Sequence, residues 1–93
     1  MNTEFAVEWN GFTTNEKRKL KTLWSKHQFP PAFCSRFAAQ IYKGAPGEAG
    51  GIFIQAKDHG AVRQHCFVEL GFSSLEDLAQ LAADVVLGVS KSV

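Results

Sequence analysis

The chain has 93 residues, which is long enough for one domain and too short for two. Its hydrophobic fraction of 45% and charged fraction of 20% are ordinary for a globular protein and argue against intrinsic disorder. The net charge of +1 combines a basic segment, residues 13–43, with a remainder from residue 44 onward that carries more acid than base. These features predict a single domain over residues 1–93 in which positive and negative charge are separated.

The cysteine content and the distribution of apolar residues predict a cytoplasmic protein that does not enter a membrane. Only Cys34 and Cys66 are present, whereas small secreted domains usually carry a framework of several disulfides. The first residues show neither the basic nor the apolar region of a cleavable signal. No apolar run approaches the roughly 18 residues that a membrane-spanning helix needs.

The first predicted strand covers residues 4–9. Phe5, Val7 and Trp9 alternate with small or acidic residues, and a period of two is typical of a strand with one buried face. Asn10-Gly11 can then turn the chain.

The next predicted element is a helix that begins after Thr13 and runs to about His27. Thr13 followed three residues later by Glu16 is a capping box, in which each side chain bonds a free backbone N–H at the helix start. Leu20, Leu23 and Trp24 form a narrow apolar stripe at helical spacing, and most of the other positions are basic.

A second helix is predicted over residues 31–43. Pro30 and Pro31 end the first helix, and a proline is well suited to the first position of the next one. Phe33, Phe37 and Ile41 recur in steps of four, which indicates one apolar helical face. Gly44 is placed to end this helix in a left-handed conformation.

A β-hairpin and a final helix complete the chain. Residues 52–57 and 61–70 alternate in polarity around a predicted turn at 58–60, with Phe67 on the less apolar face of the returning strand. Ser73 and Glu76 repeat the capping-box pattern, and a continuous apolar stripe then predicts a helix from about residue 75 to Gly88. The expected element order is β-α-α-β-β-α. We therefore expect an α+β fold with a small, mainly antiparallel three-stranded sheet covered by helices.

The sequence offers little for catalysis or metal binding. The candidate ligands and nucleophiles are His27, His59, His65, Cys34 and Cys66, and no pair among them has the spacing of a common zinc site. Cys34 lies among phenylalanines, where burial would make a thiol inert. We expect no catalytic residue, no cofactor and no metal, and favour a protein that is not an enzyme.

A nucleic-acid-binding accessory protein is one of two functions that the pattern suggests. Two helices followed by a hairpin resemble a winged helix-turn-helix in outline, and the helix pair 13–43 is basic. Its cations would contact phosphates without reading sequence. The residues of this alternative are Lys17, Arg18, Lys19, Lys21, Lys26, Arg36 and Lys43.

The leading hypothesis is a small non-enzymatic interaction module that acts through protein–protein contact and forms a homodimer or higher homo-oligomer. Eight Phe and two Trp are a heavy aromatic load for so short a chain, and some of these rings are expected to serve an interface. Trp9, Trp24 or Phe67 would anchor the partner, while Lys17, Lys21 and Lys26 would steer it by charge.

Overall fold

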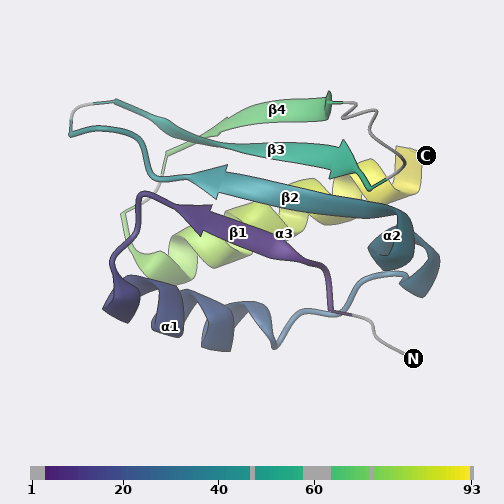
Figure 1. The fold of residues 1–93 in the computed structure, drawn as a ribbon, viewed down its shortest axis with the longest axis horizontal. Helices are drawn as coiled ribbons and strands as arrows, with labels where there is room; N and C mark the ends of the chain where they lie inside the picture. Colours follow the sequence, from purple (N-terminus) through teal and green to yellow (C-terminus); the bar gives the residue numbers. More distant parts are fainter. Residues whose placement is uncertain (1–3, 47, 58–63, 72, 93) are drawn as a thin grey trace.

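The computed structural model describes residues 4–46, 48–57, 64–71 and 73–92, and for residues 64–70 it describes the backbone alone. One four-stranded sheet is accompanied by three helices in this part of the chain (Figure 1). In chain order the elements are β1 (Val7–Asn10), α1 (Thr14–Trp24), α2 (Pro31–Arg36), β2 (Phe37–Tyr42), β3 (Gly50–Ala56), β4 (Gln64–Leu70) and α3 (Leu75–Ser92).

The sheet has the strand order β1-β2-β3-β4 and is mixed. β1 runs parallel to β2, with Trp9 opposite Ile41, whereas β2–β3 and β3–β4 are antiparallel. The parallel pairing follows from the connection, since α1 and α2 carry the chain back to the edge from which β1 started. The predicted α+β class is confirmed. The predicted element order and the predicted three-stranded sheet are wrong in part. The chain has an additional strand, β2, after α2, and β2 pairs with β1 in parallel.

The helix expected over residues 31–43 exists only in its first half. α2 ends at Arg36, and the chain continues as β2. A spacing of four, as between Phe37 and Ile41, places two residues on one side of either a helix or a strand. Ala39 distinguishes the two, because it is 2% exposed and shares the buried side only if the chain is extended. Pairing with strands on both sides then outweighs the local helical preference.

The first strand and helix both form, although the strand spans Val7–Asn10 and not residues 4–9. Phe5 and Trp9 are buried and Glu8 is exposed, as expected from the alternation. The capping box is present, with the Thr13 hydroxyl accepting from the Glu16 N–H at 3.2 Å and the Glu16 carboxylate accepting from the Thr13 N–H at 2.9 Å. α1 ends at Trp24, about one turn before the predicted end.

The hairpin and the last helix also form, with shifted boundaries. β3 and β4 pair as expected with an irregularity at Ile54/Gln55, and the predicted turn at 58–60 lies outside the described residues. α3 starts at Leu75 but continues past Gly88 to Ser92. Its start is capped one residue later than predicted, because the Asp77 N–H donates to the Ser74 hydroxyl at 3.1 Å.

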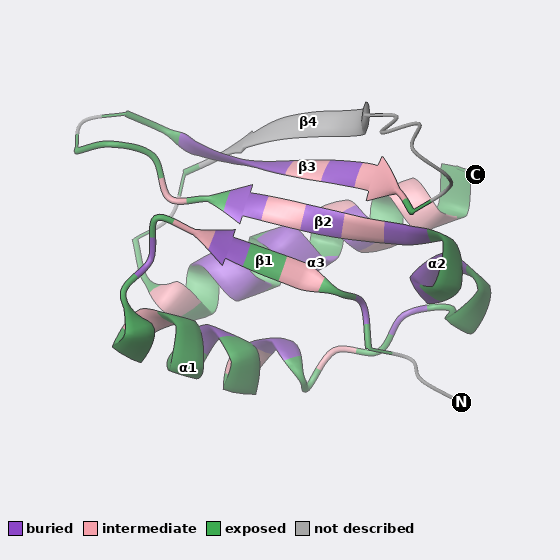
Figure 2. Cartoon of the chain, viewed as in Figure 1, coloured by how far each residue is buried: buried purple, intermediate pink, exposed green. Residues whose placement is uncertain are grey.

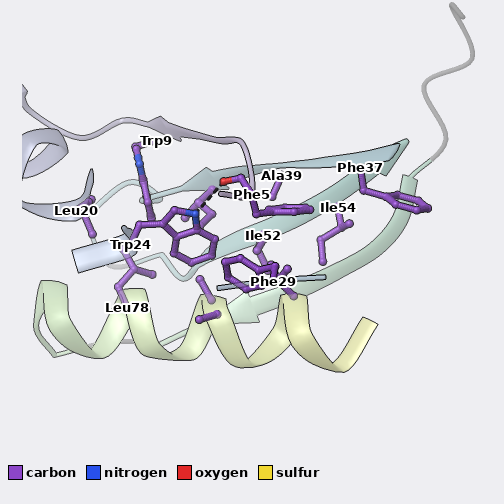
Figure 3. Close-up of a cluster of buried hydrophobic side chains, with 14 of the residues drawn as sticks. Phe5, Trp9, Leu20, Trp24, Phe29, Phe37, Ala39, Ile52, Ile54 and Leu78 are labelled. Carbon is purple, nitrogen blue, oxygen red and sulfur yellow. Dashed lines mark hydrogen bonds between the residues drawn. The ribbon is translucent and has the colours of Figure 1, made fainter. Parts of the chain in front are cut away.

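The hydrophobic core lies between one face of the sheet and α3, and α1 closes it along the β1 edge (Figures 2 and 3). α3 contributes its small and branched residues to the core, with Leu78, Ala82 and Val86 fully buried. α1 contributes Leu20 and Trp24. In the described part of the chain, the helices therefore leave the opposite face of the sheet uncovered (Figure 1).

Candidate functional site

The two tryptophans expected to anchor a partner are part of the core. Trp9 is 5% and Trp24 3% exposed, and their rings meet edge-on with centroids 5.7 Å apart. The Trp24 indole N–H donates to the backbone carbonyl of Phe5 at 2.9 Å (Figure 3). Neither ring lies at the surface where a partner would touch it. The side chain of Phe67 is outside the described residues.

Much of the remaining aromatic load is also accounted for by the core. Phe33 stacks on Phe5 and on Phe37, with centroid distances of 5.3 and 4.7 Å, and Phe29 stacks on Trp24 at 5.2 Å. Aromatic contacts of this kind contribute about 0.5–1.5 kcal/mol each beyond simple burial. A small domain has few core positions, so large rings fill them efficiently.

The sheet face that points away from the helices is the first of two candidate contact surfaces. We call it the open sheet face and define it by six described residues: Glu8, Ala38, Gln40, Tyr42, Phe53 and Gln55. Glu8 and Tyr42 are exposed, the other four are partly buried, and Glu8 is the single charged residue among the six. In Figure 2 this face is toward the viewer.

Tyr42 gives the open sheet face an ordered aromatic feature. Its ring, 39% exposed, meets the Phe53 ring edge-on at 5.6 Å, which is the diagonal cross-strand arrangement of β2 and β3. The Tyr42 hydroxyl donates to Gln40 Oε1 at 2.6 Å. This surface was not predicted from the sequence, because Gln40 and Tyr42 fall within the helix expected over residues 31–43. Their alternation with Ala39 and Ile41 was the available signal.

The exposed side of α1 is the second candidate surface. Its cations Lys17, Arg18, Lys19 and Lys21 are all exposed, as is Lys26 just beyond the helix end. The acid of the helix, Glu16, accepts from Lys43 Nζ at 2.9 Å. Hydrogen bonds from the Thr13 backbone and from Lys43 lower the pKa of the Glu16 carboxyl, so it is ionised at neutral pH.

Arg36 and Lys43 do not share a basic face, contrary to the sequence prediction. Arg36 ends α2 and lies 5.6 Å from the ring centre of Phe37, while Lys43 follows the other end of β2. A six-residue strand separates them by roughly 20 Å. Because the second predicted helix ends at Arg36 and the chain continues as β2, the predicted helix pair over residues 13–43 is not formed. Among the described residues, the cluster of exposed cations lies on α1 and just beyond its C-terminal end.

The candidate nucleophile and ligands do not assemble into a reactive site in the described part of the chain. Burial raises the pKa of the Cys34 thiol, which lies beside Ser35 and Lys57 in a cavity of about 500 Å³. Lys57 Nζ donates a hydrogen bond to the backbone carbonyl oxygen of Cys34 at 2.9 Å. His27 packs against the Trp24 and Phe29 rings. No group of three metal-ligating side chains occurs among the described residues, and His59, His65 and the Cys66 side chain lie outside them.

A second cavity, of about 600 Å³, is formed by the glycine-rich loop after β2. Gly44 has a φ of +83°, and a side chain at Gly50 would collide with the carbonyl of Tyr42, so both glycines are required by the close approach of the chain to itself. The lining is mostly small residues, with Lys43 and Glu48 as its charged members. The cavity thus offers few polar groups that could orient a ligand.

Within the described residues, none of the helices is long and apolar enough to cross a membrane. Comparisons with protein-family models, with curated proteins and with solved structures give no match. The choice between the two candidate surfaces therefore depends on their own chemistry.

Proposed function

We propose that this protein is a small non-enzymatic interaction module that self-associates through the open sheet face. The single observation that carries the proposal is the exposed Tyr42 ring, which meets the Phe53 ring edge-on on a sheet face that no helix of the described chain covers. Interface centres are enriched in aromatic residues and depleted of charge, and the described residues of the open sheet face have both properties. Two cysteines without a disulfide framework favour the cytoplasm as its location.

A second copy of the chain fits this face because, among its six described residues, Glu8 is the single charged one. Two basic or two acidic surfaces repel each other, whereas a neutral face with amide and hydroxyl groups can meet its own copy across a two-fold axis. Gln40 and Gln55 each offer both a donor and an acceptor to such a contact. Glu8 lies on the edge strand β1, where its charge can stay in water at the rim.

The size of the face sets the expected strength of the dimer. Four strands of about six residues cover roughly 20 by 20 Å, or about 400 Å² per copy. A standard stable interface buries about 800 Å² per partner. We therefore expect a weak, concentration-dependent dimer with a dissociation constant in the micromolar range or above.

Sedimentation velocity between about 1 μM and 1 mM protein tests the proposal, with two glutamine substitutions as the informative pair. Gln40→Glu keeps an acceptor for the Tyr42 hydroxyl but opposes two carboxylates across the two-fold axis, so the dissociation constant should rise at least tenfold. Gln28→Glu makes the same chemical change in the exposed loop between α1 and α2 and should leave dimerisation unchanged. A protein that stays monomeric at 1 mM, or a Gln40→Glu variant that dimerises like the wild type, would refute self-association through this face.

A further inference from the structure

The exposed half of α1 carries a concentration of positive charge that self-association through the sheet does not use. Its charged residues are Lys17, Arg18, Lys19 and Lys21, with Lys26 at the C-terminal end, and none of them forms an ion pair within the described part of the chain. Glu16 is the acid of this helix, and Lys43 compensates its charge. The surface is therefore strongly positive although the net charge of the whole chain is only +1.

The cations are distributed around the whole exposed half of the helix. Successive helical residues are turned by about 100°, and the buried residues Leu20 and Trp24 mark the side that faces the core. Lys17 and Lys21 then lie on one flank, Lys19 lies on the other, and Arg18 points away from the core between them. The two flanks are about 10–12 Å apart across the helix.

The remaining exposed residues decide which kind of partner fits. Thr14, Asn15, Thr22 and Ser25 complete this surface, and all four carry hydrogen-bonding groups. The exposed large hydrophobic residues of the described chain, Tyr42 and Leu81, are on other elements. A membrane surface needs apolar side chains to insert, and a tight protein interface needs a buried apolar or aromatic anchor. A phosphodiester backbone needs only cations and hydrogen-bond donors.

We infer that α1 binds duplex DNA by lying in the major groove with its two flanks directed at the two phosphate backbones. The groove is about 12 Å wide, which matches the width of a helix with its side chains. Phosphate contacts from both flanks hold the protein without reading sequence. The major groove of duplex RNA is too deep and narrow for this arrangement. Arg36 and Lys43 take no part, because one lies at the end of α2 and the other is paired with Glu16.

Substitution of Glu76 tests whether the Lys19 flank of α1 contacts DNA. This residue at the start of α3 lines a shallow groove of about 320 Å³ together with Arg18, Lys19 and Leu23 of α1. Its carboxyl group shares this groove with Lys19 and would repel a phosphate placed there. Glu76→Gln should therefore increase DNA affinity severalfold, whereas a protein that does not use this flank for DNA would gain nothing.

Fluorescence anisotropy with a labelled duplex DNA of about 20 base pairs tests the inference on the full chain. Four phosphate contacts predict that log K falls with log salt concentration with a slope of about −3.6, or roughly a hundredfold loss between 50 and 200 mM NaCl. The double variant Lys17→Gln/Lys21→Gln should reduce that slope by about 2. Lys91→Gln makes the same change near the end of α3 and should leave the slope unchanged. Circular dichroism confirms that each variant keeps its helix content.

Two competing ligands distinguish a helix bound in the DNA groove from a helix that attracts any polyanion. Duplex RNA of the same sequence and a poly-glutamate peptide of the same charge should both bind at least tenfold more weakly than duplex DNA at 50 mM NaCl. Equal binding of poly-glutamate would mean that α1 recognises acidic polypeptides, and equal binding of RNA would exclude the major groove. Absence of DNA binding at 50 mM NaCl, or equal effects of the α1 double variant and Lys91→Gln, would overturn the inference. None of these outcomes depends on the dimer, because Gln40→Glu can be assayed alongside as a monomeric form.

Discussion

The two faces of the sheet are made by the same strands but have different chemical character. Toward α3, β2 and β3 present Ala39, Ile41, Ile52 and Ile54, each no more than 2% exposed. On the opposite face these two strands present an alanine together with amide and aromatic side chains, all of which keep part of their surface in water. Because side chains alternate along a strand, each strand supplies one face that stabilises the fold and one that is free to take up a contact. Substitutions on the two faces should thus change the stability of the fold and the proposed self-association separately.

The largest expected difference between the faces appears when one residue of each is shortened to alanine. Ile54→Ala removes a fully buried side chain and should cost about 2–5 kcal/mol of unfolding free energy. Tyr42→Ala on the open sheet face removes one exposed ring contact and should cost about 1 kcal/mol or less. Urea denaturation in the low-micromolar protein range, below the expected dimer concentration, measures both. Equal losses would show that the open sheet face is also part of the stabilising core.

The sequence predicts the elements whose pattern has one interpretation. The alternation around Phe5 and Trp9, the capping box of Thr13 and Glu16, and the long stripe of α3 each agree with only one structure. Residues 37–42 agree with two, because a spacing of four is common to a helical face and a strand face. Only the pairing of β2 with β1 and β3 decides between them, and that pairing is a property of the tertiary structure.

The two candidate surfaces were predictable to unequal extents. The exposure of the α1 cations follows from the position of Leu20 and Trp24 in the helix, so the basic surface was visible in the sequence. The open sheet face was not, since its residues Gln40 and Tyr42 belong to the misassigned strand. The pairing of Glu16 with Lys43 joins residues 27 positions apart and also depends on where β2 ends. The error at one strand therefore propagated to the functional interpretation.

A smaller loss of stability than that of Ile54→Ala is expected when the hydrogen bond of the buried Trp24 indole N–H is removed. Trp24→Phe removes the indole N–H that bonds the buried carbonyl of Phe5, and an unsatisfied buried carbonyl costs about 1–3 kcal/mol. Trp9→Phe is the matched control, since the indole N–H of Trp9 makes no hydrogen bond in the described part of the chain. The free energy of unfolding from urea titration should fall further for Trp24→Phe than for Trp9→Phe. If the two variants lose equal stability, the hydrogen bond contributes nothing beyond ring packing.

The smallest expected effect concerns the ion pair between Glu16 of α1 and Lys43, which follows the end of β2. The pKa of Glu16 is lowered in the folded protein from its ordinary value of 4.5, first by the Thr13 N–H and then by Lys43. A carboxyl group whose pKa is lowered on folding stabilises the fold above its unfolded pKa, and this contribution is lost as the pH falls through the folded pKa.

Glu16→Gln tests this linkage, because the amide keeps an acceptor for the Thr13 N–H but has no charge to pair with Lys43. Wild type should be more stable than the variant at pH 7 and should lose that advantage on acidification through the region below pH 4.5. Urea titrations of both proteins at pH 7 and at about pH 3 give the difference, in which contributions of the other carboxylates cancel. A difference that does not change with pH would mean that Glu16 acts only as a helix cap. It would also mean that the charge of Lys43 is uncompensated and must be added to the positive surface of α1.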